Sequence, residues 1–172
     1  GEITLTTAGN DFTGAVNASG TNITLVDTNT ITLGTVTASG TLSVTAGTNI
    51  TNSGTVLVSG VTNLTASAGE ITLTTAGNDF TGVVNASGTN ITLVDTNTIE
   101  LGTVTASGTL SVTAGTNITQ SGTLLVSGAT NLTASAGEIT LTTAGNDFTG
   151  AVSATGTNIT LVDTNTITLG TV

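Results

Sequence analysis

The amino-acid sequence predicts an all-β fold, a parallel β-solenoid, from three observations. A unit of 68 residues repeats almost unchanged, apolar residues alternate with polar ones in short segments, and glycine or asparagine separates these segments. Alternation with a period of two is the pattern of a half-buried β-strand. Helical spacing of apolar residues is absent, and the frequent glycines would weaken any helix.

The repeat begins with GEITLTTAGNDFTG, which occurs at Gly1, Gly69 and Gly137. It divides the chain into copies 1–68 and 69–136 and a partial copy, 137–172, which we expect to form one continuous solenoid over residues 1–172. Five positions differ between the first two copies: Ala15/Val83, Thr32/Glu100, Asn52/Gln120, Val56/Leu124 and Val61/Ala129.

Within a copy, a G-x-V-x-[AV]-S-G segment recurs at 14–20, 34–40 and 54–60. Its alignment predicts three coils per 68-residue copy, each with three short segments whose inward residues stack into aliphatic ladders. At a spacing of about 4.8 Å per coil, each copy would advance the axis by about 14 Å. The predicted ladders are Val16/Val36/Val56, Ala18/Ala38/Val58, Ile3/Ile31/Ile50, and the pairs Ile23/Leu25, Leu42/Val44 and Leu64/Ala66.

Glycine and asparagine are expected at the corners of the coils. Glycine would supply positive φ there, and asparagine tolerates the same left-handed geometry. Stacked asparagine amides would also form hydrogen-bonded ladders between coils. The corner residues are Gly34, Gly40, Gly54 and Gly60 on one side and Asn22, Asn29, Asn49 and Asn63 on the other.

One coil of each copy carries an insertion, which in the first copy follows Ile3 and ends at Gly14. The three phenylalanines Phe12, Phe80 and Phe148 are the only aromatic residues, and all lie in these insertions. They would either anchor a partner or pack the inserted loop against the shaft. Packing is the favoured interpretation, because burying an aromatic side chain contributes about 2 kcal/mol.

The composition excludes several classes of function. The chain has no Lys, Arg, His, Cys, Tyr or Pro and a net charge of −10. Without cations it cannot bind nucleic acid or anionic lipid surfaces. The usual catalytic acid–base and nucleophile–base pairs cannot be built either, so we expect no enzyme and no cofactor. No apolar run approaches the roughly 20 residues of a membrane-spanning helix.

The phrases AGNDFTGAVNASG, LSVTAG and NITNSGTVLVSG resemble the repeats of filamentous haemagglutinin-like exoproteins, the adhesins exported by two-partner secretion. The resemblance covers the whole chain. It implies a right-handed parallel β-helix, in agreement with the handedness of parallel crossovers. It also implies the shaft of such a protein, and it carries no site residue with it.

Two kinds of candidate site remain. Turn aspartates beside asparagine offer hard oxygen ligands for calcium, although no GGxGxD motif occurs and the same residues would serve as turn formers that keep the rod soluble. Asparagines in N-x-[ST] sequons are candidate glycan acceptors, a pattern that chance also produces in a chain rich in Asn and Thr. The calcium candidates are Asp11, Asp27, Asp79, Asp95, Asp147 and Asp163, and the glycan candidates are Asn17, Asn22, Asn49 and Asn63.

A further alternative concerns the outward hydroxyls Thr24, Ser43 and Thr65, which would form a ladder like the threonine arrays of ice-binding solenoids, but Val26 interrupts the neighbouring column. The sequence therefore predicts the structural shaft of a bacterial cell-surface or secreted filamentous adhesin. Its partners would be further copies of the repeat, in the same chain or in end-to-end subunits, and a host or neighbouring cell bound through regions outside these residues. The alternative is a self-assembling extracellular filament or sheath component.

Overall fold

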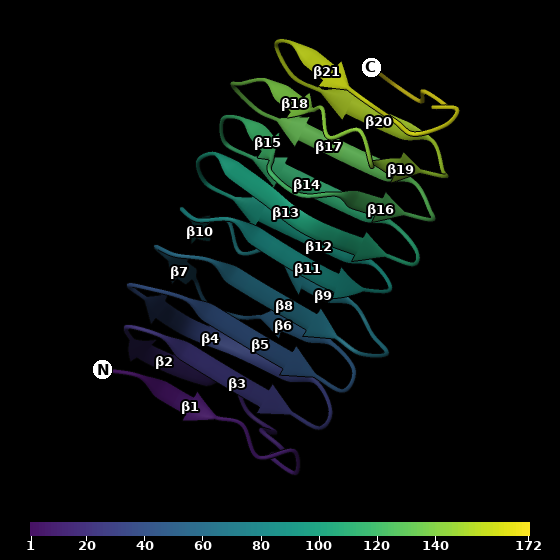
Figure 1. Ribbon diagram of the computed structural model, residues 1–172. Helices are drawn as coiled ribbons and strands as arrows, with labels where there is room; N and C mark the ends of the chain where they lie inside the picture. Colours follow the sequence, from purple (N-terminus) through teal and green to yellow (C-terminus); the bar gives the residue numbers. More distant parts are fainter.

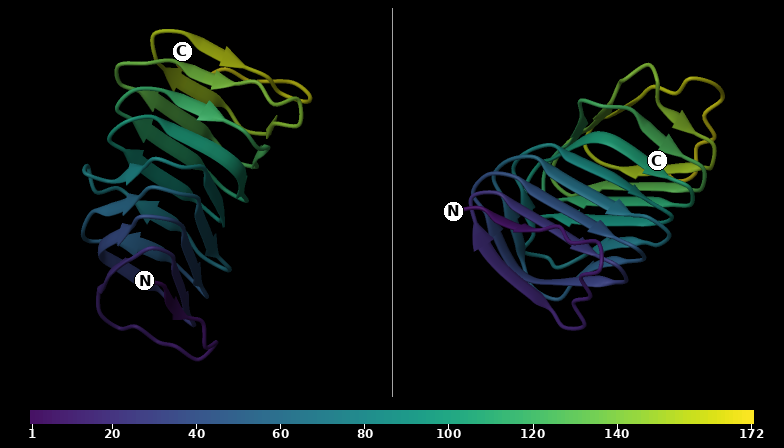
Figure 2. Two further views of the ribbon diagram at one scale, coloured as in Figure 1. Left: turned by 60° about the vertical axis from the view of Figure 1, so that its left-hand side comes forward. Right: turned by 60° about the horizontal axis from the view of Figure 1, so that its bottom comes forward.

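The computed structural model describes residues 1–172 and consists of two parallel β-sheets that face each other across one core. The coils stack along a single axis, with the two termini at opposite ends (Figure 1, Figure 2). The chain is a rod built from strands and turns, and it has no helix long and apolar enough to cross a membrane.

The first sheet has 11 strands. They are β1 (Ile3–Leu5), β3 (Ile23–Asp27), β5 (Leu42–Ala46), β8 (Thr62–Ala66), β11 (Val84–Gly88), β13 (Ile99–Ala106), β15 (Ile118–Gln120), β16 (Leu124–Val126), β18 (Ile139–Leu141), β19 (Asp147–Phe148) and β21 (Ile159–Leu161).

The second sheet has 10 strands. They are β2 (Val16–Gly20), β4 (Ile31–Ala38), β6 (Ile50–Asn52), β7 (Val56–Val58), β9 (Ile71–Leu73), β10 (Asp79–Phe80), β12 (Ile91–Asp95), β14 (Leu110–Ala114), β17 (Thr130–Ala134) and β20 (Val152–Thr155). All the strand pairs in both sheets are parallel, which confirms the predicted fold class.

The coils wind in the right-handed sense. In Figure 1 the near strands run from left to right, the far strands return from right to left, and the chain climbs from its N-terminal to its C-terminal end. This is the winding expected for parallel strands joined by crossovers.

The number of coils in a copy differs from the prediction. Ile3 and Ile139 are equivalent residues two copies apart, and the path between them in the first sheet, β1-β3-β5-β8-β11-β13-β15-β18, has seven steps. A copy therefore makes three and a half coils, not three. At about 4.8 Å per coil, each copy advances the axis by about 17 Å.

Because a copy ends half a coil out of step, equivalent strands change sheets from one copy to the next. The ITLVD segment is β3 in the first sheet, β12 in the second sheet, and its third copy returns to the first sheet as β21. The insertions alternate in the same way, since β10 belongs to the second sheet and β19 to the first. Figure 1 accordingly shows β10 and β19 at opposite edges of the rod.

The register confirms part of the predicted ladders. Ile31 pairs with Ile50, Val36 pairs with Val56, and Leu25 pairs with Val44. Each of these ladders joins coils that contain no insertion between the aligned residues.

Three predicted columns were wrong. Val16 lies opposite Leu33 instead of Val36, and Ile3 lies opposite Ile23 instead of Ile31. Leu64 lies opposite Val44, two residues from the predicted partner. The first and last errors are shifts of two residues along the strand, which keep the inward face inward because side chains alternate with a period of two.

The corner glycines also have a different role from the one predicted. No residue, glycine included, has a positive φ. Gly34 lies inside the eight-residue strand β4, where an extra residue shifts the register against β2. Gly60 lies directly over Gly40, and a Cβ added to it would come 2.7 Å from the Gly40 carbonyl oxygen. Glycine is required at such positions because one coil stacks closely on the next.

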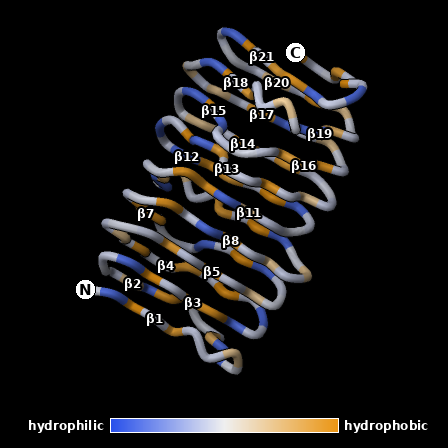
Figure 3. Tube along the Cα trace, viewed as in Figure 1, coloured by the Kyte–Doolittle hydropathy of each residue, from blue (hydrophilic) through white to orange (hydrophobic).

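The core is one cluster of 38 buried apolar residues that runs the length of the rod. Figure 3 shows the apolar residues recurring along the strands, coil after coil. A single coil could not bury these side chains, so each coil depends on its neighbours for stability.

Thr62 interrupts this core. It lies in the inward column between Leu42 and Val84, is fully buried, and its hydroxyl has no hydrogen-bond partner. Since a buried hydroxyl without a partner costs about 1 kcal/mol or more, Thr62→Val should raise the free energy of unfolding by about 1 kcal/mol. Urea unfolding followed by circular dichroism measures it, with the outward Thr65→Val as the control. A loss of stability in Thr62→Val would contradict the prediction.

Candidate functional site: the inserted loops and a hydroxyl-lined groove

Each inserted loop folds back onto the rod through a turn and a buried phenylalanine. In the second copy the Asn78 amide donates to the Thr75 carbonyl oxygen at 3.0 Å. The chain then enters β10, where Phe80 pairs with Val58 and is fully buried. Phe148 is buried in the same way, and Phe12 is partly buried against the core. The predicted packing role of the phenylalanines is confirmed.

An asparagine in the loop replaces a missing backbone partner. The Asn78 side chain is fully buried, and its Oδ1 accepts hydrogen bonds from the Val56 amide at 3.0 Å and from Asn52 Nδ2 at 2.9 Å. Its own Nδ2 has no partner. The side chain thus ties the loop to the coil below while leaving one buried donor unsatisfied.

The third copy solves this problem with a longer side chain. Gln120, at the position equivalent to Asn52, donates from Nε2 to Asn146 Oδ1 and accepts from Asn146 Nδ2, both at 2.8 Å. The two amides therefore pair twice, where Asn52 and Asn78 pair once. This explains why glutamine is accommodated at this position.

Asn52→Gln should therefore stabilise the second inserted loop. We expect the free energy of unfolding to rise by about 1 kcal/mol, because a buried N–H donor gains its acceptor. The matched exchange, Gln120→Asn, should lower it by a similar amount. Thermal unfolding of the two variants measures both changes, and equal effects of the same sign would refute the explanation.

A buried aspartate holds each loop from the other side. Asp95 is 2% exposed, and its Oδ2 accepts from the Phe80 amide at 2.7 Å while its Oδ1 accepts from the Asn97 amide at 2.6 Å. Asp27 makes the same pair of bonds in the first copy, to the amides of Phe12 and Asn29. Sequence reasoning placed these aspartates in turns, which accounts for the bond two residues ahead, and it missed the bond to the phenylalanine amide.

The calcium candidates fall into two groups. Asp27, Asp95 and Asp163 direct carboxylate oxygens at loop amides. The loop aspartates Asp79 and Asp147 accept instead from the side-chain amides of Asn97 and Asn165. No group of three or more His, Cys, Asp or Glu residues is arranged to hold a metal ion. Calcium binding, including at Asp11, stays a prediction.

The glycan candidates all serve as acceptors between coils. The Oδ1 atoms of Asn17, Asn22 and Asn49 accept from backbone amides of the next coil at 2.8 to 3.0 Å, and Asn63 Oδ1 accepts from Asn85 Nδ2 at 3.0 Å. The predicted amide ladders are confirmed for Asn63 and Asn85, whereas the others bond to backbone. Glycosylation of these four asparagines stays a prediction.

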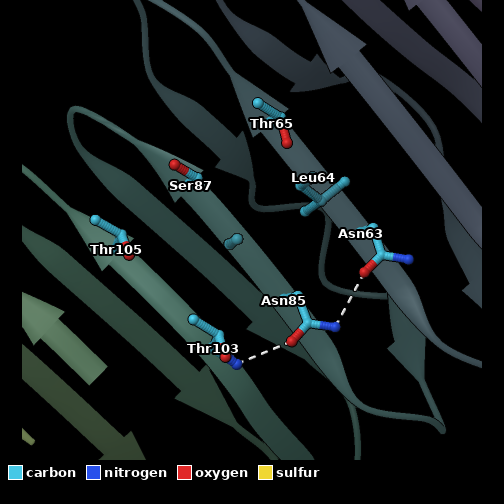
Figure 4. Close-up of a pocket in the computed structure, with 8 residues that line it drawn as sticks. Asn63, Leu64, Thr65, Asn85, Ser87, Thr103 and Thr105 are labelled. Carbon is cyan, nitrogen blue, oxygen red and sulfur yellow. Dashed lines mark hydrogen bonds between the residues drawn. The ribbon is translucent and has the colours of Figure 1, made fainter. Parts of the chain in front are cut away.

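A groove crosses the outer face of β8, β11 and β13 (Figure 4). It consists of two adjoining hollows of about 220 and 330 Å³ that share Thr65, Ser87 and Thr105. Its lining contains no charged and no aromatic residue. The full lining is Asn63, Leu64, Thr65, Ala66, Ser67, Asn85, Ala86, Ser87, Gly88, Thr89, Thr103, Thr105 and Ser107.

The repeat matches a known family. A family of repeats of unknown function, DUF5649, matches residues 1–19, 20–87 and 88–155. The chain belongs to this family. The two complete DUF5649 matches each span 68 residues, the period found in the sequence, and their boundaries fall at a different point in the repeat. No curated protein and no solved structure matches the chain.

In the second DUF5649 copy, burial makes Asp95 sensitive to pH. Desolvation raises its pKa above the ordinary value of 3.8, the nearby Asp79 raises it further, and the hydrogen bonds from the amides of Phe80 and Asn97 oppose the shift. The folded state therefore binds this proton more tightly than the unfolded state.

Stability should consequently increase on acidification. The contribution from Asp95 is fully present below the unfolded pKa and is lost as the pH rises through the folded pKa. We expect the midpoint of urea unfolding to be higher at pH 4 than at pH 7, the reverse of ordinary acid denaturation. In Asp95→Asn this difference should shrink, while overall stability falls because an amide NH₂ would meet a backbone N–H. A midpoint that rises steadily with pH would contradict this.

Proposed function

We propose that the chain is the structural shaft of a bacterial cell-surface or secreted filamentous adhesin, which displays a distal binding region and mediates attachment. The observation that carries the proposal is the continuity of the core across copies. Each DUF5649 copy stacks on the previous one through the same parallel pairing, so length grows by about 17 Å per copy without any new structural element.

The sequence supports the same proposal. Its phrases resemble the repeats of filamentous haemagglutinin-like exoproteins. The absence of Lys and Arg also leaves trypsin no cleavage site. A rod of this kind would suit the outside of a bacterial cell, where its partners would be further copies of the repeat and, through other regions, a host or neighbouring cell.

A second candidate is a self-assembling extracellular filament or matrix component. The near-identity of the copies favours it, since identical units can stack between chains as they stack within one. The alternation of the inserted loops between opposite edges would also let one rod contact neighbours on both sides.

Isolation of the native protein from the cell surface and culture medium distinguishes the two. An adhesin shaft should be one very long polypeptide, seen by electron microscopy as an unbranched rod of about 17 Å per copy. A native subunit near 16.6 kDa that polymerises would favour the filament instead. Native protein found only inside the cell would contradict both proposals.

Deletion of whole copies tests the shaft geometry. Removal of two copies, which is seven coils, should shorten the rod and leave the orientation of everything beyond it unchanged. Removal of one copy should rotate the distal part by half a turn, because three and a half coils are lost. Gold labels on either side of the deletion report the change. Identical label geometry in the two deletions would refute the half-coil arrangement.

A further inference from the structure

We propose that the groove on β8, β11 and β13 binds a neutral, extended polysaccharide of the β-1,4-linked type, aligned with the rod axis. The groove is hollowed into the outer sheet face and has a polar, uncharged lining. This site is distinct from the inserted loops, and it would give the shaft a binding activity of its own.

The first argument is the state of the hydroxyl groups. Among the eight residues drawn in Figure 4, the only hydrogen bonds run from Asn85 Nδ2 to Asn63 Oδ1 at 3.0 Å and from the Thr103 amide to Asn85 Oδ1 at 2.8 Å. The hydroxyls of Thr65, Ser87 and Thr105 bond to no protein group in the groove. Corner threonines behave differently, as Thr98 and Thr116 bond to each other. The groove therefore presents free donors and acceptors together.

The second argument is their spacing. Ser87 pairs with Thr65 on one side and with Thr105 on the other, so the three hydroxyls form a line along the rod. Successive strands are about 4.8 Å apart. Each sugar of an extended β-1,4-linked chain advances by a similar distance, so one sugar would meet one coil. An α-1,4-linked chain winds and cannot keep this register.

The third argument is charge and shape. The chain carries −10 charges and no cation, which disfavours anionic polysaccharides. Ser87, the smallest of the three hydroxyl residues, lies between two threonines and leaves room for a ring above it. The third copy has Thr155 at the equivalent position on β20, and none of the cavities of the structure lies there.

Hydrogen bonds without aromatic stacking make a weak site, which we expect to have a Kd in the millimolar range for one groove. Affinity would come from repetition, because a long polysaccharide can engage several grooves of a long rod at once.

The test is titration of the full 172-residue chain, isotopically labelled, with cellohexaose and separately with maltohexaose. Cellohexaose should shift the amide resonances of Thr65, Ser87 and Thr105, and maltohexaose should bind at least tenfold more weakly. Ser87→Ile, which fills the groove and removes its central hydroxyl, should weaken cellohexaose binding at least tenfold. Ser19→Ile, at the equivalent position on β2, is the matched control and should leave it unchanged.

Ser87→Thr provides a variant that copies a residue already present in the third repeat and should fold. It should weaken binding about threefold by narrowing the hollow. The proposal is overturned if cellohexaose leaves the groove resonances unmoved, if Ser87→Ile binds as well as the native chain, or if maltohexaose produces the same shifts as cellohexaose. None of these outcomes bears on the shaft proposal, which concerns the native length and location of the protein.

Discussion

Gly47→Ala should destabilise the rod by about 3 kcal/mol. A Cβ at Gly47 would clash with the carbonyl oxygen of Thr28 in the coil below, which is backbone and cannot rotate away. The two coils would have to move apart, weakening the hydrogen bond from the Gly47 amide to Asp27 and the one from Thr48 to Asn29, both 3.0 Å long. Overpacking that forces a backbone shift has this magnitude.

Gly9→Ala is the matched control for this prediction. A Cβ at Gly9 would meet nothing within 4 Å, and no glycine in the chain has a positive φ. Alanine there should raise stability by about 0.5 kcal/mol through the unfolded state. Urea unfolding of both variants measures the difference. Similar effects at the two positions would mean that close stacking does not select glycine.

The sequence predicted the fold class and most of the core because both depend on local alternation repeated many times. Ile31 and Ile50 could be aligned since the segments around them have the same spacing to the next glycine. Val16 could not, because β4 carries an extra residue at Gly34 that shifts the register against β2. Nothing in the sequence marks Gly34 as part of a strand instead of a corner.

The coil count was missed for a related reason. Coils in this protein differ in length, and the sequence period of 68 residues is not a whole number of coils. A copy is the unit of sequence, whereas the coil is the unit of packing. The only sign of the mismatch is the strand register, which alignment of glycine motifs does not report.

The candidate site was predicted by residue type and missed in its contacts. Asp27 was expected in a turn, and its bond to the Asn29 amide follows from that local sequence. Its bond to the Phe12 amide joins residues 15 apart and depends on how the inserted loop folds back. The groove depends on the small size of Ser87 in one coil relative to its neighbours, which becomes visible only when the register is known.

Phe80→Ala should have the largest effect on stability of the substitutions considered, a loss of about 4 kcal/mol. Phe80 is among the largest fully buried side chains, and its burial places its own amide beside Asp95 and the Thr81 amide beside the Val58 carbonyl oxygen. Removing the ring leaves a cavity under the loop and loosens these bonds. Thermal unfolding gives the loss, and hydrogen exchange should rise over residues 74–82.

Phe12→Ala separates packing from any role of phenylalanine as a surface anchor. Phe12 is only partly buried, so its replacement should cost less than half as much as that of Phe80. If the phenylalanines instead served a partner, both substitutions would leave stability unchanged and the loop amides protected. The ratio of the two losses therefore tests whether the insertions are held to the rod by burial of one ring per copy.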